Sequence, residues 1–178
     1  MRELSLASTG VSDRGVGMLK ALRLRTLDLS GTKLTNKGLS NLKGSPNLSI
    51  LNLSNTAITD AGMLTLSQMP ALTELYVSAT KIGDEGLKTI STFPKLESLD
   101  VSDTKITDSG CKSLSQTKGL RYIKASGTAI TKAGLDAILR NGALARVDAD
   151  RCTKLTKAEM EKIQSDHKGT LITGTAGG

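Results

Sequence analysis

A unit of 24 residues recurs along the chain, and this fixed period constrains the fold more than any other feature. Five consecutive units have this length: residues 24–47, 48–71, 72–95, 96–119 and 120–143. Residues 1–23 form a unit one residue shorter, and residues 144–167 form a seventh with an inserted residue near Arg151 and Cys152. Self-similarity at such a period is the signature of a solenoid, in which each unit packs only on its neighbours.

Each unit begins with alternating apolar residues. Counted from the first residue of a unit, positions 4 and 6 are apolar throughout: Leu4 and Leu6, Leu27 and Leu29, Leu51 and Leu53, Leu75 and Val77, Leu99 and Val101, Ile123 and Ala125, Val147 and Ala149. Alternation of this kind is typical of a strand with one buried face. We therefore expect positions 4 and 6 to face the core and positions 3, 5 and 7 to face outward.

A helix-start signal follows the strand. Position 12 carries a hydroxyl that can accept the first free backbone N–H groups of a helix, and the residues concerned are Ser12, Thr35, Thr59, Thr107 and Thr131. The next position places negative charge at the positive end of the helix dipole in four units, with Asp13, Asp60, Asp84 and Asp108. The seventh unit has a capping-box pattern from Thr156 to Glu159.

A glycine recurs three residues after the helix start in the first six units: Gly15, Gly38, Gly62, Gly86, Gly110 and Gly134. Glycine costs stability in a helix, so we expect it to permit close approach of that turn to the neighbouring unit. The apolar residues that follow, such as Leu87 and Ile90, share one helix face. Each unit is thus predicted to be a short strand, a turn, a short helix and a return loop.

The consensus LxxLxLSxTxITDxGLxxL resembles the leucine-rich-repeat proteins. It is most similar to the strand–helix class of ribonuclease inhibitor and F-box adaptors, and especially to bacterial members with Thr-x-Ile-Thr-Asp repeats. The resemblance covers about residues 1–165 and implies an α/β solenoid of about seven repeats, with a parallel sheet on the concave face and helices on the convex face. The family often has Asn or Cys at position 9, where this chain has threonine: Thr9, Thr32, Thr56, Thr80, Thr104 and Thr128. We expect this threonine column to hydrogen-bond the buried turn backbone.

Residues able to perform catalysis or to hold a metal are scarce. Cys111 and Cys152 have no Cys or His at ligand spacing, and Cys111 occupies an apolar helix position, where we expect a small core residue. The single histidine, His167, stands near the C-terminal end. Nucleotide-binding loops and hydrolase motifs are missing from the sequence. The sequence therefore predicts a non-enzymatic protein with no cofactor and no metal.

Charge and hydropathy limit the kinds of partner and the compartments that the sequence favours. The net charge is +7, but the lysines are spread over all units and the chain has only three aromatic residues. A nucleic-acid footprint would be clustered and interleaved with aromatics, so nucleic acid is not favoured as a partner. No apolar run reaches the ~20 residues of a membrane span, and MRELSLASTG lacks the features of a signal peptide. The compartment stays open, with the cytoplasm favoured.

The variable outward positions are the candidate partner-binding residues. Both tyrosines of the chain, Tyr76 and Tyr122, fall on the predicted concave face, roughly 12 Å apart if strands are ~4.8 Å apart. Tyrosine is over-represented among interface anchors, although an exposed tyrosine can also merely satisfy β propensity. The polar residues expected to orient a partner are Asp28, Asn52, Glu74, Asp100, Lys124 and Arg146. Acidic residues dominate the first five strands and basic residues the last two.

The two ends differ. The polar helix of residues 144–167 lacks the repeat glycine and predicts a C-terminal cap on a solenoid spanning residues 1–167. Residues 168–178 are predicted to add a closing strand and a Gly-rich tail. The first residues already lie inside a repeat, which favours a chain cut from a larger protein over an edge covered by another copy or a partner.

We therefore expect a module that binds a protein partner through a rigid concave sheet. Two alternatives stay open. One is a structural or assembly element that forms homo-oligomers or docks through its N-terminal edge. The other, which the resemblance to F-box proteins permits, is the substrate-recognition part of a larger complex such as a ubiquitin ligase.

Overall fold

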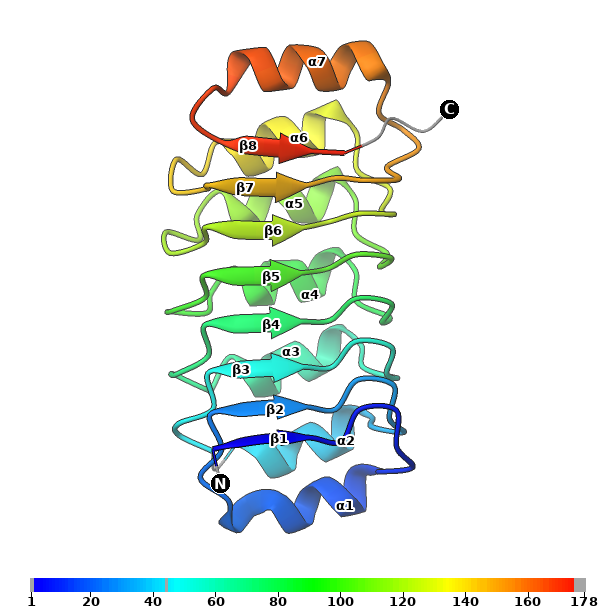
Figure 1. Cartoon of the computed structure of the whole chain (residues 1–178), viewed down its shortest axis with the longest axis vertical. Coiled ribbons are helices and arrows are strands. Elements are labelled where there is room, and N and C mark those ends of the chain that lie inside the picture. The colour runs from blue at the N-terminus through cyan, green and yellow to red at the C-terminus, as the bar shows by residue number, and fades with distance from the viewer. Residues whose placement is uncertain (1, 44, 175–178) are drawn as a thin grey trace.

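The computed structural model describes residues 2–43 and 45–174, and within them eight strands form one parallel sheet in chain order (Figure 1). The strands are β1 (Glu3–Ser5), β2 (Thr26–Asp28), β3 (Ile50–Asn52), β4 (Glu74–Tyr76), β5 (Ser98–Asp100), β6 (Tyr122–Lys124), β7 (Arg146–Asp148) and β8 (Leu171–Thr173). The helices are α1 (Asp13–Gly17), α2 (Asn36–Leu39), α3 (Asp60–Leu66), α4 (Asp84–Ile90), α5 (Asp108–Leu114), α6 (Lys132–Leu139) and α7 (Lys157–Asp166). Two 3₁₀ turns, η1 (Met18–Ala21) and η2 (Ser40–Leu42), extend α1 and α2.

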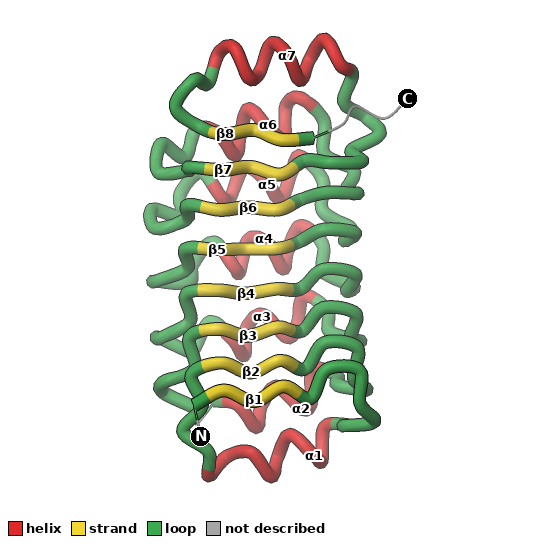
Figure 2. The backbone as a smooth tube through the Cα atoms, in the orientation of Figure 1, coloured by secondary structure: helices red, strands yellow, loops and turns green. Residues whose placement is uncertain are grey.

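The strands form one layer and the helices a second layer behind it (Figure 2). The row of helices extends past the row of strands at both ends, with α1 beyond β1 and α7 beyond β8 (Figure 1). The sheet therefore lies on the shorter, inner side of the arc, because helices take more room per repeat than strands. The predicted α/β solenoid with a concave parallel sheet is confirmed.

Constant repeat length sets the register of the sheet. Leu27 pairs with Leu51, and Leu51 pairs with Leu75, so equivalent positions of neighbouring repeats lie side by side. Parallel pairing normally needs a crossover connection, and here each helix with its two loops provides one. Every side chain of the concave face is therefore aligned with the same position of the next repeat.

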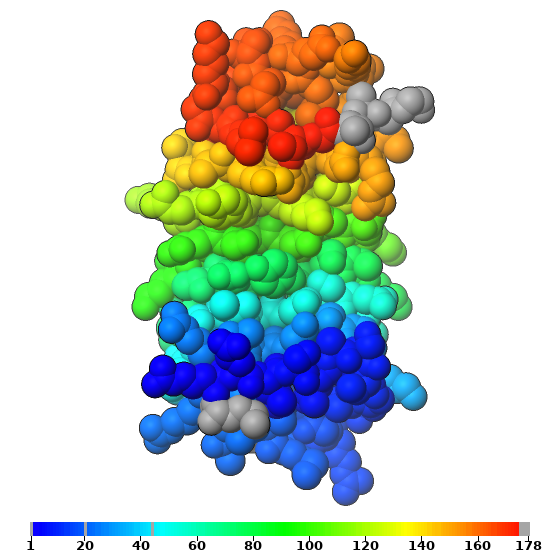
Figure 3. All heavy atoms as spheres, viewed as in Figure 1, coloured from blue at the N-terminus to red at the C-terminus, as the bar shows by residue number. Residues whose placement is uncertain are grey.

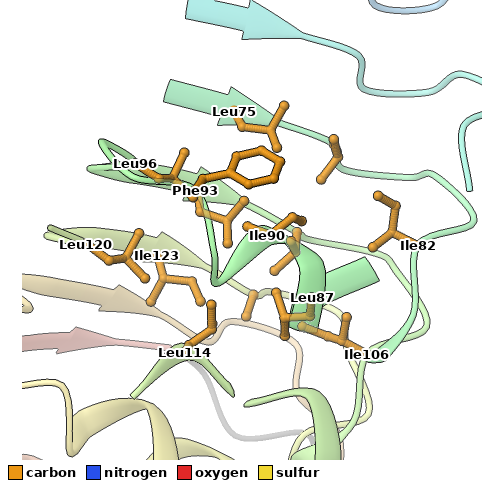
Figure 4. Packing of buried hydrophobic residues seen from close by; sticks show 14 of the residues in the cluster. Leu75, Ile82, Leu87, Ile90, Phe93, Leu96, Ile106, Leu114, Leu120 and Ile123 are labelled. Carbon is orange, nitrogen blue, oxygen red and sulfur yellow. The ribbon is translucent and has the colours of Figure 1, made fainter. Parts of the chain in front are cut away.

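The core is a stack of identical layers between sheet and helices. In the fourth repeat, Leu75, Val77, Ile82, Leu87 and Ile90 are all fully buried. Figure 4 shows side chains from strand, turn and helix pointing toward one another, with the ring of Phe93 between Leu75 and Leu96. Each buried aliphatic side chain contributes about 1.5–3 kcal/mol. Cys111, which in the fifth repeat occupies the helix position of Leu87, is fully buried, as predicted.

The threonine column is structural, as predicted. Each hydroxyl donates to the carbonyl three residues earlier, at 2.6 Å for Thr56 to Leu53 and 2.5 Å for Thr104 to Val101. The same bond is made by Thr9, Thr32, Thr80 and Thr128. Because these carbonyls lie just after the strands, the hydroxyls give the turn backbone a hydrogen-bond donor within the same repeat.

The helix caps form a ladder that links neighbouring repeats. Thr35, Thr107 and Thr131 accept N–H groups at the start of their own helices, and Thr156 and Glu159 form the predicted capping box. The prediction is wrong for Ser12 and Thr59, whose hydroxyls accept no such bond. The Thr59 hydroxyl accepts instead from the Asn36 amide at 2.7 Å, because an Asx side chain of the preceding repeat reaches this position.

In the first five repeats the Asp or Asn at position 13 therefore caps the next repeat, and the four aspartates also bear charge at their own helices. The Asp84 carboxylate accepts the backbone N–H and the hydroxyl of Thr107, both at 2.7 Å. The same contact recurs from Asp13 to Thr35, from Asp60 to the N–H of Gly83 and from Asp108 to Thr131. Asn36 takes this role toward Thr59.

This ladder explains the repeat glycine. A Cβ on Gly110 would lie 2.6 Å from Asp84 Oδ1, and one on Gly134 would lie 2.3 Å from Asp108 Oδ1. The predicted close approach of the helical turn to its neighbour is confirmed. At Gly15 the same position would meet only the side chain of Val11, at 3.3 Å or more.

The C-terminal end carries the helix α7 and the strand β8. Of the α7 residues only Ile163 is buried, which leaves a polar outer surface. β8 pairs in parallel with β7, and its Ile172 N–H donates to the Gln164 side chain of α7 at 3.2 Å. Residues 175–178 of the predicted Gly-rich tail lie outside the described residues.

Candidate protein-binding surface

The concave face is built from positions 3 and 5 of each strand. In every strand from β2 to β7 the central residue is buried and the two flanking residues are half-buried or exposed. Figure 3 displays this side of the molecule, where the side chains of successive repeats form bands in chain order. All of the sequence-predicted partner-binding residues lie at these flanking positions.

Tyr76 is held by its own strand. Its hydroxyl donates to Glu74 Oε2 at 2.6 Å, and the ring is half-buried. The hydrogen bond to Glu74, together with burial and the negative charges of Glu74 and Asp100, raises the pKa of Tyr76 to about 12. The ring is therefore fixed as a neutral phenol before any partner arrives.

Tyr122 is the exposed member of the pair. Half of its surface is open to solvent, at 50%. Both rings line one hollow of about 270 Å³, whose floor includes Ser98 and Asp100 of the intervening strand β5. The structure thus brings the two predicted anchors to one site.

Two basic residues lie at the C-terminal side of the hollow, one with a carboxylate partner and one without. Arg146 is paired within its strand, since its guanidinium donates to Asp148 at 3.1–3.2 Å. Asp148 also accepts the Thr173 hydroxyl of β8. Lys124 is exposed and has no carboxylate within ion-pair distance in the described part of the chain. An adjoining hollow of about 350 Å³ is lined by Lys124, Arg146 and Asp148 as well.

Three of the predicted site residues turn back on the backbone. Asp28, Asn52 and Asp100 each accept the N–H two residues later, at 2.9–3.0 Å. These bonds are Asx turns, which hold the chain as it leaves the strand. Asp100 lies in the hollow even so, whereas Asp28 and Asn52 are two and one strands away from β4 and do not line it.

Two family profiles match the sequence, both described as leucine rich repeat, over residues 23–82 and 94–115. With the repeat geometry above, they decide the family. The chain is a leucine-rich-repeat protein. Proteins of this family generally act in protein–protein interactions.

The fold of this leucine-rich-repeat chain is similar to a solved structure, internalin C2 from Listeria monocytogenes. The superposition has a TM-score of 0.66 and 17% sequence identity, and it covers 97% of this chain and 80% of the internalin chain. At this identity the likeness concerns the fold alone. Among proteins with curated functions, none matches the sequence.

Residues that sequence reasoning missed also shape the leucine-rich-repeat surface. Asp148 neutralises Arg146, and the signal for this pair was opposite charge at alternate positions of one strand. Arg151 reaches across Gly127 to Asp103, two repeats away, at 3.0 Å. A Cβ on Gly127 would lie 2.2 Å from Asp103 Oδ1, so this ion pair depends on the glycine between its partners. The sequence separation of 48 residues hid the contact.

The described residues offer little metal or redox chemistry. No group of three or more His, Cys, Asp or Glu side chains among them is arranged to hold a metal ion. Cys111 and Cys152 are free and buried, and burial raises the pKa of Cys111 to about 12. Its thiol therefore stays protonated and unreactive at neutral pH. None of the helices in residues 2–43 and 45–174 has the length and apolarity needed to cross a membrane.

Proposed function

We propose that this protein is a non-enzymatic module that binds a protein partner on its concave sheet, with the hollow between Tyr76 and Tyr122 at the centre of the interface. The observation that carries the proposal is the meeting of both tyrosines of the chain at one hollow. Aromatic anchors seated in pockets dominate the energy of many protein interfaces. The general role of the family agrees with this function.

Preorganisation supports the proposal. The strands are held on both sides by backbone ladders, and the Tyr76 ring is held by Glu74. A surface that is already ordered loses little conformational entropy when a partner binds, so more of the contact energy appears as affinity.

The side chains around the hollow would make different kinds of contact with a partner. Tyr122 provides the accessible aromatic area, and Lys124 provides a positive charge that no described carboxylate neutralises. Arg146 is paired with Asp148 and contributes as a neutral unit that donates and accepts hydrogen bonds. Asp28 and Asn52 belong to turns outside the hollow, so we assign them no more than a peripheral contact. The partner surface that fits best carries a carboxylate for Lys124 beside an apolar group for Tyr122.

The assignment to a non-enzymatic class rests on the side chains at the hollow. Neither cysteine reaches it, since both are in the core, and the single histidine follows α7. A nucleophile needs an adjacent base or a lowered pKa to be activated. The Tyr76 hydroxyl does lie beside the Glu74 carboxylate, but that contact raises the pKa of Tyr76 to about 12 and so keeps the phenol protonated.

A capture experiment tests the proposal. The wild-type protein and the Tyr122→Ala/Lys124→Ala variant are each used to capture partners from cell lysate, followed by mass spectrometry. The matched control is Leu64→Ala/Lys88→Ala, which removes an exposed apolar group and an exposed lysine from the helical face. A protein captured by the wild type and the control, and lost with the concave variant, supports the proposal. Equal capture by all three would place the interface elsewhere.

A second candidate function has one observation in its favour. At the β1 edge no described Asx side chain lies over Gly15, which faces only Val11 of its own repeat, whereas an Asx side chain of the preceding repeat lies over the glycine in the following repeats. The neighbouring Leu4, Leu6 and Val11 are only partly buried. We infer as an alternative that this edge forms oligomers or docks on another unit. Light scattering over a range of protein concentrations tests self-association, and a monomer throughout would remove that form of the alternative.

A further inference from the structure

Three arginines meet at the N-terminal corner of the solenoid. Arg2 and Arg25 occupy the same position in the first two repeats, just before β1 and β2, and Arg23 ends the return loop between them. Together with Asn47, they line a hollow of about 450 Å³. The three arginines flank the starts of β1 and β2, whereas the tyrosine hollow is lined by residues of β4 to β7. Figure 1 shows β1 and β2 at one end of the sheet and β4 to β7 further along it.

The backbone fixes the spacing of these arginines. The carbonyl of Arg2 accepts the N–H groups of Arg25, at 2.7 Å, and of Thr26, at 3.1 Å. The carbonyl of Arg25 in turn accepts the N–H groups of Ser49 and Ile50. Arg2 and Arg25 are therefore held about one strand spacing apart, ~4.8 Å. Arg23 and Asn47 are likewise equivalent residues of neighbouring repeats, so the four side chains surround the hollow.

The charge of the cluster is not neutralised within the described residues. Arg146 and Arg151, elsewhere on the surface, each pair with an aspartate at 3.0–3.1 Å. None of the three clustered arginines has a carboxylate within 4.0 Å in residues 2–43 and 45–174, although Glu3 follows Arg2 directly in the sequence. Like charges held side by side repel, so an anion seated among them is favoured.

The chemistry of the side chains selects the anion. A guanidinium presents planar paired donors that match the oxygens of phosphate. Asn47 adds an amide donor without adding a competing negative charge. A phosphorylated side chain carries a charge of about −1.5 to −2 at neutral pH, which several arginines together can offset.

The space at the cluster extends beyond a single ion. A second hollow, of about 510 Å³, shares Arg23 and Asn47 with the first and is lined further by Leu22, Leu24 and Pro46. One water molecule takes about 30 Å³ in the liquid, so the two hollows have room for a phosphate group and an apolar neighbour. We propose that this corner binds a phosphorylated serine or threonine of a protein segment, with the following apolar residue in the second hollow. The site is independent of the concave-face proposal.

Calorimetric titration of the full chain tests this site. The probes are a short peptide containing phosphoserine followed by leucine, the same peptide with unmodified serine, and inorganic phosphate. We expect saturable binding of the phosphopeptide and binding at least about tenfold weaker for the unmodified peptide. The Arg23→Gln/Arg25→Gln variant should weaken phosphopeptide binding by about tenfold or more, because two charge-assisted contacts are lost.

The control variant is Arg14→Gln/Arg140→Gln, which removes the same net charge from two exposed arginines outside the cluster. It should bind the phosphopeptide like the wild type, and both variants should unfold at the wild-type temperature. Absence of saturable phosphopeptide binding, or an equal loss in the control, would overturn the proposal. Inorganic phosphate binding as tightly as the phosphopeptide would also overturn the peptide assignment, since the second hollow would then contribute nothing.

Discussion

At the scale of the single residue, the repeats share a backbone conformation at a position whose residue type differs from repeat to repeat. Position 8 of every repeat has positive φ, between 53° and 66°. The residues concerned are Ser8, Gly31, Asn55, Ala79, Asp103, Gly127 and Arg151. Glycine adopts this left-handed conformation without a steric penalty, and Asn and Asp tolerate it. Ser8, Ala79 and Arg151 have neither advantage, so at these three positions the fold overrides the local preference of the residue.

We predict that Ala79→Gly raises the free energy of unfolding by about 1 kcal/mol, because it removes the left-handed strain. Ala79 is exposed, so the substitution loses little packing. The control is Ala57→Gly, at an exposed alanine outside the positive-φ positions. Glycine there raises the conformational entropy of the unfolded chain, so the free energy of unfolding should be unchanged or lower. Chemical denaturation measures both. A variant Ala79→Gly no more stable than Ala57→Gly would contradict the argument.

Tyr76 gives a second prediction at this scale, through its pKa. The hydrogen bond to Glu74 requires the protonated phenol, so the folded-state pKa is raised from 10.0 to about 12. A raised pKa stabilises the fold fully below the unfolded value, and this contribution is lost as the pH rises from about 10 through about 12. In the Tyr122→Phe background, ultraviolet titration follows Tyr76 alone. We expect Glu74→Gln to lower its midpoint toward 10, and an unchanged midpoint would show that Glu74 is not the cause.

At the scale of the element, the short helices are positioned by the repeats beside them. An isolated helix of seven residues is not stable in water, yet α3, α4 and α5 have this length. Each is held by its apolar face and by an Asx side chain of the preceding repeat, which binds the cap residue and passes over the repeat glycine. The glycine and the preceding aspartate are therefore one structural unit.

The same substitution should have opposite effects at two glycines of this column. Gly110→Ala would bring its Cβ within 2.6 Å of Asp84 Oδ1 and 3.0 Å of Asp84 Cα, and we expect a loss of about 1–3 kcal/mol from this overpacking. The Cβ of Gly15→Ala would meet only the side chain of Val11, at 3.3 Å. Val11 is partly buried and belongs to the same repeat, so we expect it to shift, and the helical preference of alanine should then raise the free energy of unfolding by up to about 1 kcal/mol. Thermal and chemical unfolding measure the pair.

Substitutions of Asp84 provide the matching control. Asp84→Ala removes two hydrogen bonds to Thr107 and should destabilise by about 2 kcal/mol. Asp84→Asn should be milder, because Asn36 performs the same task toward Thr59 in the second repeat. The cost of Gly110→Ala should shrink when Asp84 is already alanine. Additive effects in the double variant would separate the glycine from the aspartate and contradict the proposed unit.

At the scale of the whole molecule, stability is distributed along one dimension. Apart from the ion pair of Arg151 with Asp103, the repeats pack on their immediate neighbours, so an end repeat is supported from one side. The two ends are not equivalent. α7 and β8 follow the last full repeat, whereas at β1 the half-buried Leu4, Leu6 and Val11 have no described layer beyond them.

We predict a gradient of hydrogen exchange along the solenoid. Amides of β1 and α1 should exchange faster than those of β4 to β6, because opening the first repeat breaks one interface whereas opening a central repeat breaks two. β7, covered by β8, should exchange more slowly than β1. Mass spectrometry of proteolytic fragments measures this order. Uniform protection from β1 to β6 would indicate that the chain opens only as a whole.

The sequence alone determined the architecture. The constant period fixes the register of the strand pairs from β2 to β7, since equal repeats of 24 residues place equivalent positions side by side. Alternation at positions 4 and 6 identifies the core face, and the position-9 threonines identify the turn. The outward placement of Tyr76 and Tyr122 followed from the same counting. These features recur from repeat to repeat, so a single sequence contains several independent examples of each pattern.

Only the tertiary structure showed which side chains of different repeats bond to one another. It also showed where the backbone adopts a conformation that the residue type disfavours. The bond from Asp84 to Thr107 spans 23 residues, and that from Arg151 to Asp103 spans 48. The positive φ at Ala79 has no signal in its residue type. The Asx turns that hold Asp28 and Asn52, and the arginine corner at Arg2 and Arg25, also depend on where side chains lie in space. The physical reason is common to all: a period specifies which positions are neighbours, whereas the geometry of the stack specifies which atoms come within bonding distance.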